Sequence, residues 1–111
     1  MIDLEFVKGV NEAICDEDGK KSIVINENNI LSALSVQQWY DKEEYLASAL
    51  LRSLIIGHGF QDANKRTAAV VANSICPFRC PDKIAENCII NIAIGKLKEV
   101  QEISDILYED K

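Results

Sequence analysis

The stretch from Lys42 to Ile56 constrains the fold more than any other part of the sequence. Its apolar residues recur three and four positions apart, as they do along one face of an α-helix. They are Leu46, Ala49, Leu50, Leu51, Leu54, Ile55 and Ile56. A helix that is apolar on most sides is surrounded by other helices. We therefore expect it at the centre of a helical domain, ending at Gly57 in the left-handed conformation that glycine permits.

The same periodicity covers most of the remaining chain. No proline occurs before Pro77, and alternation of β-branched or aromatic residues is scarce. Further helices are predicted at about 3–14, 28–34, 64–75, 82–94 and 99–108, with Asn28 or Asn29 capping the second. The segment 22–26 resembles a strand but is too isolated to make a sheet. The prediction is an all-α fold, a compact bundle of about six helices in a single domain, residues 1–111.

Composition excludes several classes of function. No apolar run approaches the length of a membrane span. The formal net charge of −6 disfavours a large nucleic-acid footprint, which usually needs a basic face. The chain starts Met-Ile-Asp-Leu-Glu, without a basic region before an apolar stretch, so we expect no signal peptide and a cytoplasmic location.

Two groups of side chains have both structural and functional interpretations. Cys76 and Cys80 are separated by three residues and each precedes a proline, a spacing that suggests zinc. Zinc ribbons and fingers need two close pairs, whereas Cys15 and Cys88 are single, so reduced thiols packed as apolar residues are favoured. The aromatic pair Trp39-Tyr40 is interpreted as the edge of the core rather than the mouth of a pocket.

Residues 57–69, Gly-His-Gly-Phe-Gln-Asp-Ala-Asn-Lys-Arg-Thr-Ala-Ala, hold the only histidine of the chain. A glycine-punctuated turn here leads into a helix that begins at Asn64, with Lys65 and Arg66 beside its free N–H groups. Such a helix start attracts phosphate. His58, open between two glycines, is suited to act as a base. Asp62 can cap the helix, orient the histidine or hold a divalent cation. A base, a carboxylate and a phosphate cradle are what phosphoryl or nucleotidyl transfer requires.

Each of these residues also has an ordinary structural explanation. A histidine between glycines is commonly a turn residue, and an aspartate before a helix is commonly its N-cap. Lys65 and Arg66 are typical of a solvated surface, although positive charge at a helix start opposes the helix dipole and so favours a bound anion. Phe60 is expected to anchor the turn in the core.

The run from His58 to Ala68 resembles the signature of the Fic/Doc family, His-x-Phe-x-Asp/Glu-Gly/Ala-Asn-Gly/Lys-Arg. Its Asp-Ala-Asn-Lys-Arg-Thr-Ala portion is similar to the Doc, or death-on-curing, toxin branch rather than to the AMP-transferring Fic branch. Six informative positions match at fixed spacing. Outside the motif, the chain length, the apolar helix before it, the break at 94–96 and the short closing helix agree with the resemblance.

The resemblance implies an active-site loop between a buried central helix and the N-terminus of the next. His58 would be the general base that removes a proton from the hydroxyl of a protein substrate. Asp62 would help to bind Mg²⁺ or orient the histidine. Gly57 and Phe60 would be structural parts of the motif.

The resemblance also implies the nucleotide contacts. Asn64 and Lys65, with backbone N–H groups, would form the anion hole, and Arg66 would bind nucleotide phosphates. Fic enzymes have glycine in place of Lys65 and a second arginine in place of Ala69. In Doc-like proteins this pattern accompanies a reversed nucleotide and transfer of the terminal phosphate of ATP, which implies a protein kinase. AMP transfer of the Fic type, and a catalytically silent binding module of the same fold, are the alternatives.

Partners follow from the same resemblance. The target would be a translation protein such as elongation factor Tu, and a Phd-like antitoxin would neutralise the toxin in trans. The sequence contains no convincing Ser/Thr-x-x-x-Glu inhibitory helix, which agrees with control by a separate protein. The family docks its target on a flap before the motif helix, so the docking segment is expected within Ser22–Tyr40. No nucleic-acid or membrane partner is expected.

Overall fold

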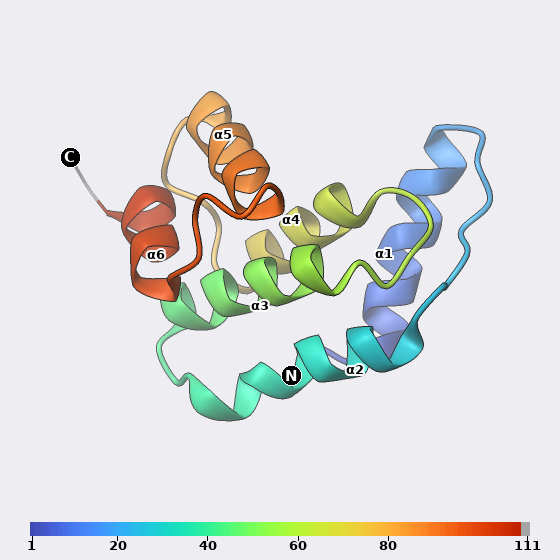
Figure 1. Cartoon of the computed structure of the whole chain (residues 1–111), viewed down its shortest axis with the longest axis horizontal. Helices are drawn as coiled ribbons and strands as arrows, with labels where there is room; N and C mark the ends of the chain where they lie inside the picture. The colour runs from blue at the N-terminus through green and yellow to red at the C-terminus, as the bar shows by residue number, and fades with distance from the viewer. Residues whose placement is uncertain (110–111) are drawn as a thin grey trace.

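Helix α3 (Glu43–Gly57) lies at the centre of the bundle in the computed structural model, which describes residues 1–109 (Figure 1). Around it lie α1 (Leu4–Glu17), α2 (Glu27–Leu34), a 3₁₀ helix (Ser35–Trp39), α4 (Asn64–Ile75), α5 (Asp82–Ala93) and α6 (Val100–Tyr108). Helix α3 packs against α2, α4, α5 and α6, and its Ala47, Leu50 and Leu51 are fully buried. The predicted all-α bundle and its central helix are therefore confirmed for the described residues.

Helix α4 begins and ends where the sequence predicted. Its small residues allow close packing, and Ala68, Val71 and Ala72 are completely buried. Helix α3 covers one side of α4 and α1 covers another. The N-terminus of α4 is therefore carried by two packed helices, and this is what positions the site described below.

Helix α1 is longer than the predicted 3–14, and its most buried face includes a polar residue. Asp3 caps it, because its side chain accepts a hydrogen bond from the Phe6 N–H at 2.9 Å. The buried residues are Val7, Asn11 and Cys15, whereas Leu4, Val10 and Ile14 are only half-buried. Asn11 is polar, so the apolar pattern does not place it on this buried face.

Several local predictions were wrong. Asn26, rather than Asn28 or Asn29, caps α2, with its Oδ1 accepting the Asn29 N–H at 3.0 Å. Trp39 is 73% exposed and so is not the edge of the core. Ile56, assigned to the apolar face of the central helix, is 56% exposed. An apolar helix at the centre still has a side that reaches solvent near its end.

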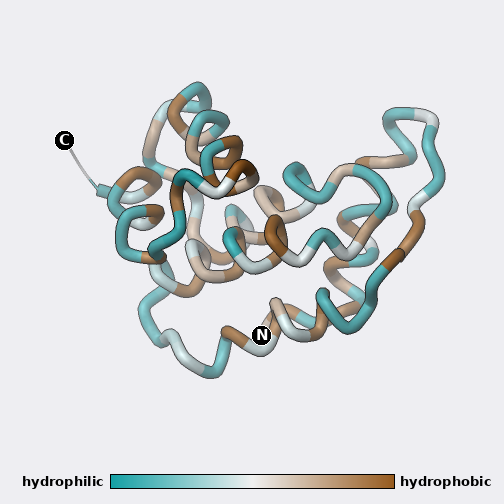
Figure 2. Tube along the Cα trace, in the orientation of Figure 1, coloured by the Kyte–Doolittle hydropathy of each residue, from teal (hydrophilic) through white to brown (hydrophobic). Residues whose placement is uncertain are grey.

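The strand-like segment pairs with the loop that follows α3. Val24 and Phe60 form an isolated antiparallel bridge, and the Ile25 and Asn26 N–H groups both donate to the Gly59 carbonyl at 2.8 and 3.0 Å. Figure 1 shows the connection between α1 and α2 running past this loop. Figure 2 shows that the connection is hydrophilic after α1 and hydrophobic where it approaches α2. In residues 1–109 the bridge extends into no sheet, as predicted.

Across residues 1–109, no helix combines the length and the apolar character needed to cross a membrane.

Candidate functional site

The loop between α3 and α4 contains two non-glycine residues in the left-handed region. His58 has φ 47° and ψ 53°, and Ala63, immediately before α4, has φ 64° and ψ 27°. Non-glycine residues in this region are uncommon and gather at functional sites. The prediction that Gly57 adopts this conformation was wrong. Gly57 is the last residue of α3, and His58 adopts the left-handed conformation. Gly57 instead allows a close approach, since an added Cβ would lie 3.3 Å from the Asn29 carbonyl oxygen.

The loop is fixed to α2 by packing. A Cβ added at Gly59 would lie 2.3 Å from Cγ1 of Ile30, so only glycine fits there. Phe60 is 2% exposed and belongs to the core, as predicted. Asn29 Nδ2 donates to the Gly57 carbonyl at 2.7 Å. His58 is therefore presented by a backbone that is held on both sides.

Asn64 closes the loop from the first turn of α4. Its Oδ1 accepts the Phe60 N–H at 3.0 Å, and its Nδ2 donates to the Phe60 carbonyl at 2.7 Å. These two bonds fix the orientation of the amide, so the 3.3 Å contact from Nδ2 to His58 Nδ1 has the amide as donor. Neutral His58 then carries its proton on Nε2. The side-chain amide of Asn64 is therefore occupied by hydrogen bonds within the loop. Only the backbone N–H of Asn64 is available to an anion.

The sequence-predicted residues converge on one open hollow of about 530 Å³. It is lined by Ile55, His58, Gln61, Asp62, Ala63, Asn64, Lys65, Arg66 and Ala93. The N-cap residue of α4 is Ala63, which makes no side-chain capping bond, and the N–H groups of a first helical turn have no partners within the helix. A histidine, a carboxylate, two cations and free N–H groups therefore share one hollow, an arrangement suited to a phosphorylated ligand.

Two ion pairs connect this hollow to the turn after α1. Arg66 pairs with Asp18, and Lys20 Nζ lies 3.7 Å from Asp62 Oδ1. The hydrogen bond from Arg66 lowers the pKa of the Asp18 carboxyl against a smaller effect of desolvation, and Asp18 in turn raises the pKa of Arg66. Lys65 has no ion-pair partner among residues 1–109, so it is the cation of the hollow that is available to a ligand.

Sequence reasoning missed every residue that supports the site from the α1 side. Asn11 bonds to the loop, and Asp18 and Lys20 pair with its charged residues. The one signal that could have found Asn11 is its spacing, because it lies four residues from both Val7 and Cys15 on the buried face of α1. Nothing in the sequence marks Asp18 or Lys20 as partners of a loop more than 40 residues away.

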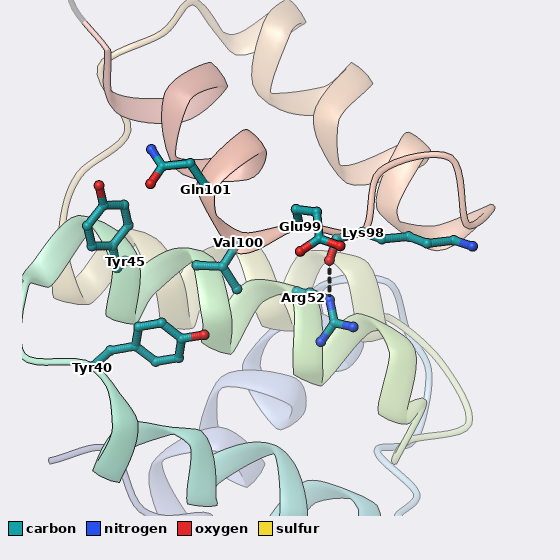
Figure 3. A pocket seen from close by; sticks show the side chains of 7 residues that line it. All are labelled: Tyr40, Tyr45, Arg52, Lys98, Glu99, Val100 and Gln101. Atoms are coloured by element: carbon teal, nitrogen blue, oxygen red, sulfur yellow. Dashed lines mark hydrogen bonds between the residues drawn. The ribbon is translucent and has the colours of Figure 1, made fainter.

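A second hollow, of about 630 Å³, lies near the other end of α3. Its lining residues are Tyr40, Tyr45, Arg52, Lys98, Glu99, Val100 and Gln101. Figure 3 shows the two tyrosine rings on one side and the Arg52 guanidinium and Glu99 carboxylate on the other. Arg52 Nε donates to the Lys98 carbonyl at 2.6 Å. Tyr40 thus lines a pocket, the alternative to the core-edge interpretation. Opposite charges and no histidine make this hollow the weaker candidate.

The cysteines line neither hollow and are all free thiols. Cys15, Cys76 and Cys88 are buried, and burial raises the pKa of the Cys88 thiol to about 11. A raised pKa disfavours the thiolate that metal binding and nucleophilic attack require. Among residues 1–109, no three histidine, cysteine, aspartate or glutamate side chains are grouped as metal ligands. Cys76, Cys80 and Cys88 pack in or against the hydrophobic core, whereas the Cys15 thiol bonds to Asn11.

Comparison with known proteins gave no match to a protein-family model, a curated protein or a solved structure.

Proposed function

We propose that this chain is a Doc-like toxin that transfers the terminal phosphate of ATP to a serine or threonine hydroxyl of a protein. The observation that carries the proposal is the convergence of His58, Asp62, Lys65 and Arg66 on one hollow at the N-terminus of α4. Resemblance to the Fic/Doc signature assigns a role to each of these residues, and the hollow brings all of them within reach of one ligand.

The reaction needs a base and a cradle. The substrate hydroxyl gives its proton to His58 while its oxygen bonds to the γ-phosphorus, and the bond from that phosphorus to the bridging oxygen breaks to release ADP. Lys65 and the first N–H groups of α4, joined by Arg66 once it has left Asp18, bind the phosphates and stabilise the charge that develops on them. Base action at Nε2 requires the other tautomer of His58, in which the 3.3 Å contact with Asn64 is lost.

Magnesium fits this hollow through one carboxylate. Mg²⁺ is usually held by one or two carboxylates together with phosphate oxygens and water. Asp62 lines the hollow, and its ion pair with Lys20 is long, at 3.7 Å, and partly exposed. The ion would neutralise charge on the phosphates. Asp62 would hold it once Lys20 has moved away.

Two positions on α4 favour phosphate transfer over AMP transfer. Lys65 adds a charged side chain where Fic enzymes have glycine, and Ala69 supplies no second phosphate clamp. Ala69 is half-buried against the core, so its position is also unsuited to a cation. We further propose a translation protein like elongation factor Tu as substrate, a Phd-like antitoxin as inhibitor and the cytoplasm as location, all on the resemblance alone.

The decisive experiment incubates the protein and Mg²⁺ with purified elongation factor Tu and ATP labelled at either the γ or the α phosphate. Phosphate transfer places only the γ label on the protein substrate. Transfer of the α label would overturn the kinase proposal in favour of AMP transfer. If neither label is transferred and a His58→Ala variant inhibits growth as strongly as the parent, the chain is a binding module.

A further inference from the structure

Asn11, in the middle of α1, is fully buried and uses every part of its amide. Its Nδ2 donates to the Asp62 carbonyl at 2.9 Å and to Thr67 Oγ1 at 3.0 Å. Its Oδ1 accepts from Ser22 Oγ at 2.5 Å and from Cys15 Sγ at 3.6 Å. A buried amide is tolerated only when its polar atoms are hydrogen-bonded, as those of Asn11 are.

The bond to the Asp62 carbonyl lies at a sensitive point of the chain. That carbonyl belongs to the peptide that joins Asp62 to Ala63, the residue with φ 64°. A non-glycine residue holds such a conformation only when its surroundings enforce it. The orientation of this peptide sets where the Asp62 side chain points and how the first N–H groups of α4 face the hollow.

We infer that Asn11 is a positioning residue of the candidate site. By holding the Asp62 carbonyl, it enforces the left-handed turn at Ala63 and turns the free N–H groups at the α4 N-terminus toward the hollow in which an anion would bind. The nature of that anion, a polyphosphate, rests on the proposed function, whereas the positioning of the loop rests on the hydrogen bonds alone.

If the role of Asn11 were purely structural, it would only join α1 to α4. A substitution at Thr67, its partner on α4, distinguishes that role from positioning of the loop. Asn11→Leu has similar volume and removes all four bonds, those to Asp62 and Thr67 together with those to Ser22 and Cys15. Thr67→Val, the matched control, removes the acceptor on α4 and leaves the bond to Asp62 in place. Thr67 is 2% exposed, so both variants perturb the same buried network. Asn11→Ser, a smaller polar change, replaces Asn11→Leu where the latter does not fold.

Three quantities are measured on each variant: the melting temperature, the imidazole proton resonances of His58, and the affinity for tripolyphosphate. Since His58 is the only histidine, its resonances need no assignment. We expect Asn11→Leu to shift them and to weaken tripolyphosphate binding about tenfold, because small displacements of positioned groups have large effects. Thr67→Val should lower the melting temperature and change the affinity by less than about twofold.

The outcomes separate this inference from the proposed function. Asn11→Leu or Asn11→Ser that is folded and binds tripolyphosphate like the parent overturns the inference and leaves the proposed function intact. If the parent binds tripolyphosphate, Asn11→Leu weakens that binding and the parent transfers no γ-phosphate, the inference is supported and the kinase proposal is overturned. A folded parent that does not bind tripolyphosphate overturns the inference and removes the support for a nucleotide at this hollow.

Discussion

Two segments flank α4: the loop that joins it to α3 and the connection that joins it to α5. Both are anchored to α4 in the same way, but only the first has charged groups that face a hollow. An asparagine of α4 accepts the N–H of a phenylalanine in each. Asn64 Oδ1 accepts from Phe60 at 3.0 Å, and Asn73 Oδ1 accepts from Phe78 at 2.9 Å. One helix thus fixes the segment before it and the segment after it by the same device.

The connection after α4 is closed by α6. The Arg79 and Cys80 N–H groups donate to the Leu107 carbonyl, and the Tyr108 hydroxyl donates to the Cys76 carbonyl at 2.8 Å. The Phe78 and Tyr108 rings pack edge to face with centroids 6.0 Å apart, and the Arg79 guanidinium lies over the Tyr108 ring. The cation of this connection, Arg79, is therefore occupied by Tyr108. No residue of the connection adopts the left-handed conformation.

The loop before α4 instead has two strained residues and aims its charges at a hollow. Backbone anchoring is therefore common to both segments and does not mark a site. The distinguishing features are the strain at His58 and Ala63 and the cation at Lys65 that has no partner in residues 1–109. Variants in the first loop should change chemistry, and variants in the second should change stability alone.

The largest effect is expected for His58→Ala. If His58 is the proposed general base, its loss should reduce phosphate transfer by about 10²- to 10⁴-fold with little change in folding, because the side chain is not part of the buried core. Transfer of γ-labelled phosphate measures it. Arg79→Lys is the matched control in the second segment and should transfer at the parental rate. Equal losses in both variants would break the comparison.

Gly59→Ala tests the packing that holds the first loop. The new Cβ would lie 2.3 Å from Ile30 Cγ1, so the free energy of unfolding should fall by about 1–3 kcal/mol. Urea denaturation measures the change. Gly9→Ala is the control, since its Cβ meets nothing within 4 Å on a helix, and it should gain about 0.5–1 kcal/mol. A Gly59→Ala protein as stable as the parent would contradict the tight contact with α2.

These tests concern features that the sequence predicted to different extents. The central helix and the bounds of α4 follow from periodicity and small residues, because local spacing decides which face is buried. The role of Phe60 as an anchor follows for the same reason, since a large apolar residue inside a polar turn needs a buried place. The grouping of His58, Asp62 and Lys65 follows because a turn before a helix keeps neighbours together.

Long-range partners could not be predicted in this way. The bond of Asn11 to Asp62 and the pairing of Asp18 with Arg66 depend on how α1 packs against α4. The left-handed turn at His58 was missed because glycine has the better intrinsic preference for it, whereas Gly57 is needed where α3 approaches Asn29. Tertiary contacts here override local preference.

Tyr108→Phe tests the second segment. It removes the hydroxyl that donates to the Cys76 carbonyl and should lower the free energy of unfolding by about 1 kcal/mol, with phosphate transfer unchanged. Burial raises the pKa of Tyr108, so the neutral form favours the folded state. The parent should therefore lose stability as pH rises above about 10, where unfolded tyrosine ionises, and the variant should lose less. Reduced phosphate transfer by Tyr108→Phe would show that the connection after α4 also affects the activity of the hollow, contrary to the comparison.

The smallest effect is expected for Asp18→Asn, which releases Arg66 at the edge of the hollow. An exposed ion pair is weak, so freeing the guanidinium should raise tripolyphosphate affinity by about two- to fivefold, measured by calorimetry at low salt. Asp16→Asn is the control, because it removes the same charge two residues away, in the last turn of α1, and Asp16 makes no ion pair within residues 1–109. Since Arg66 lowers the pKa of Asp18, the pair persists in mild acid and is lost only as pH falls through that lowered value. The gain should therefore be constant from neutral to mildly acidic pH. Equal gains in the two variants would show that net charge, rather than competition for Arg66, governs what the hollow admits.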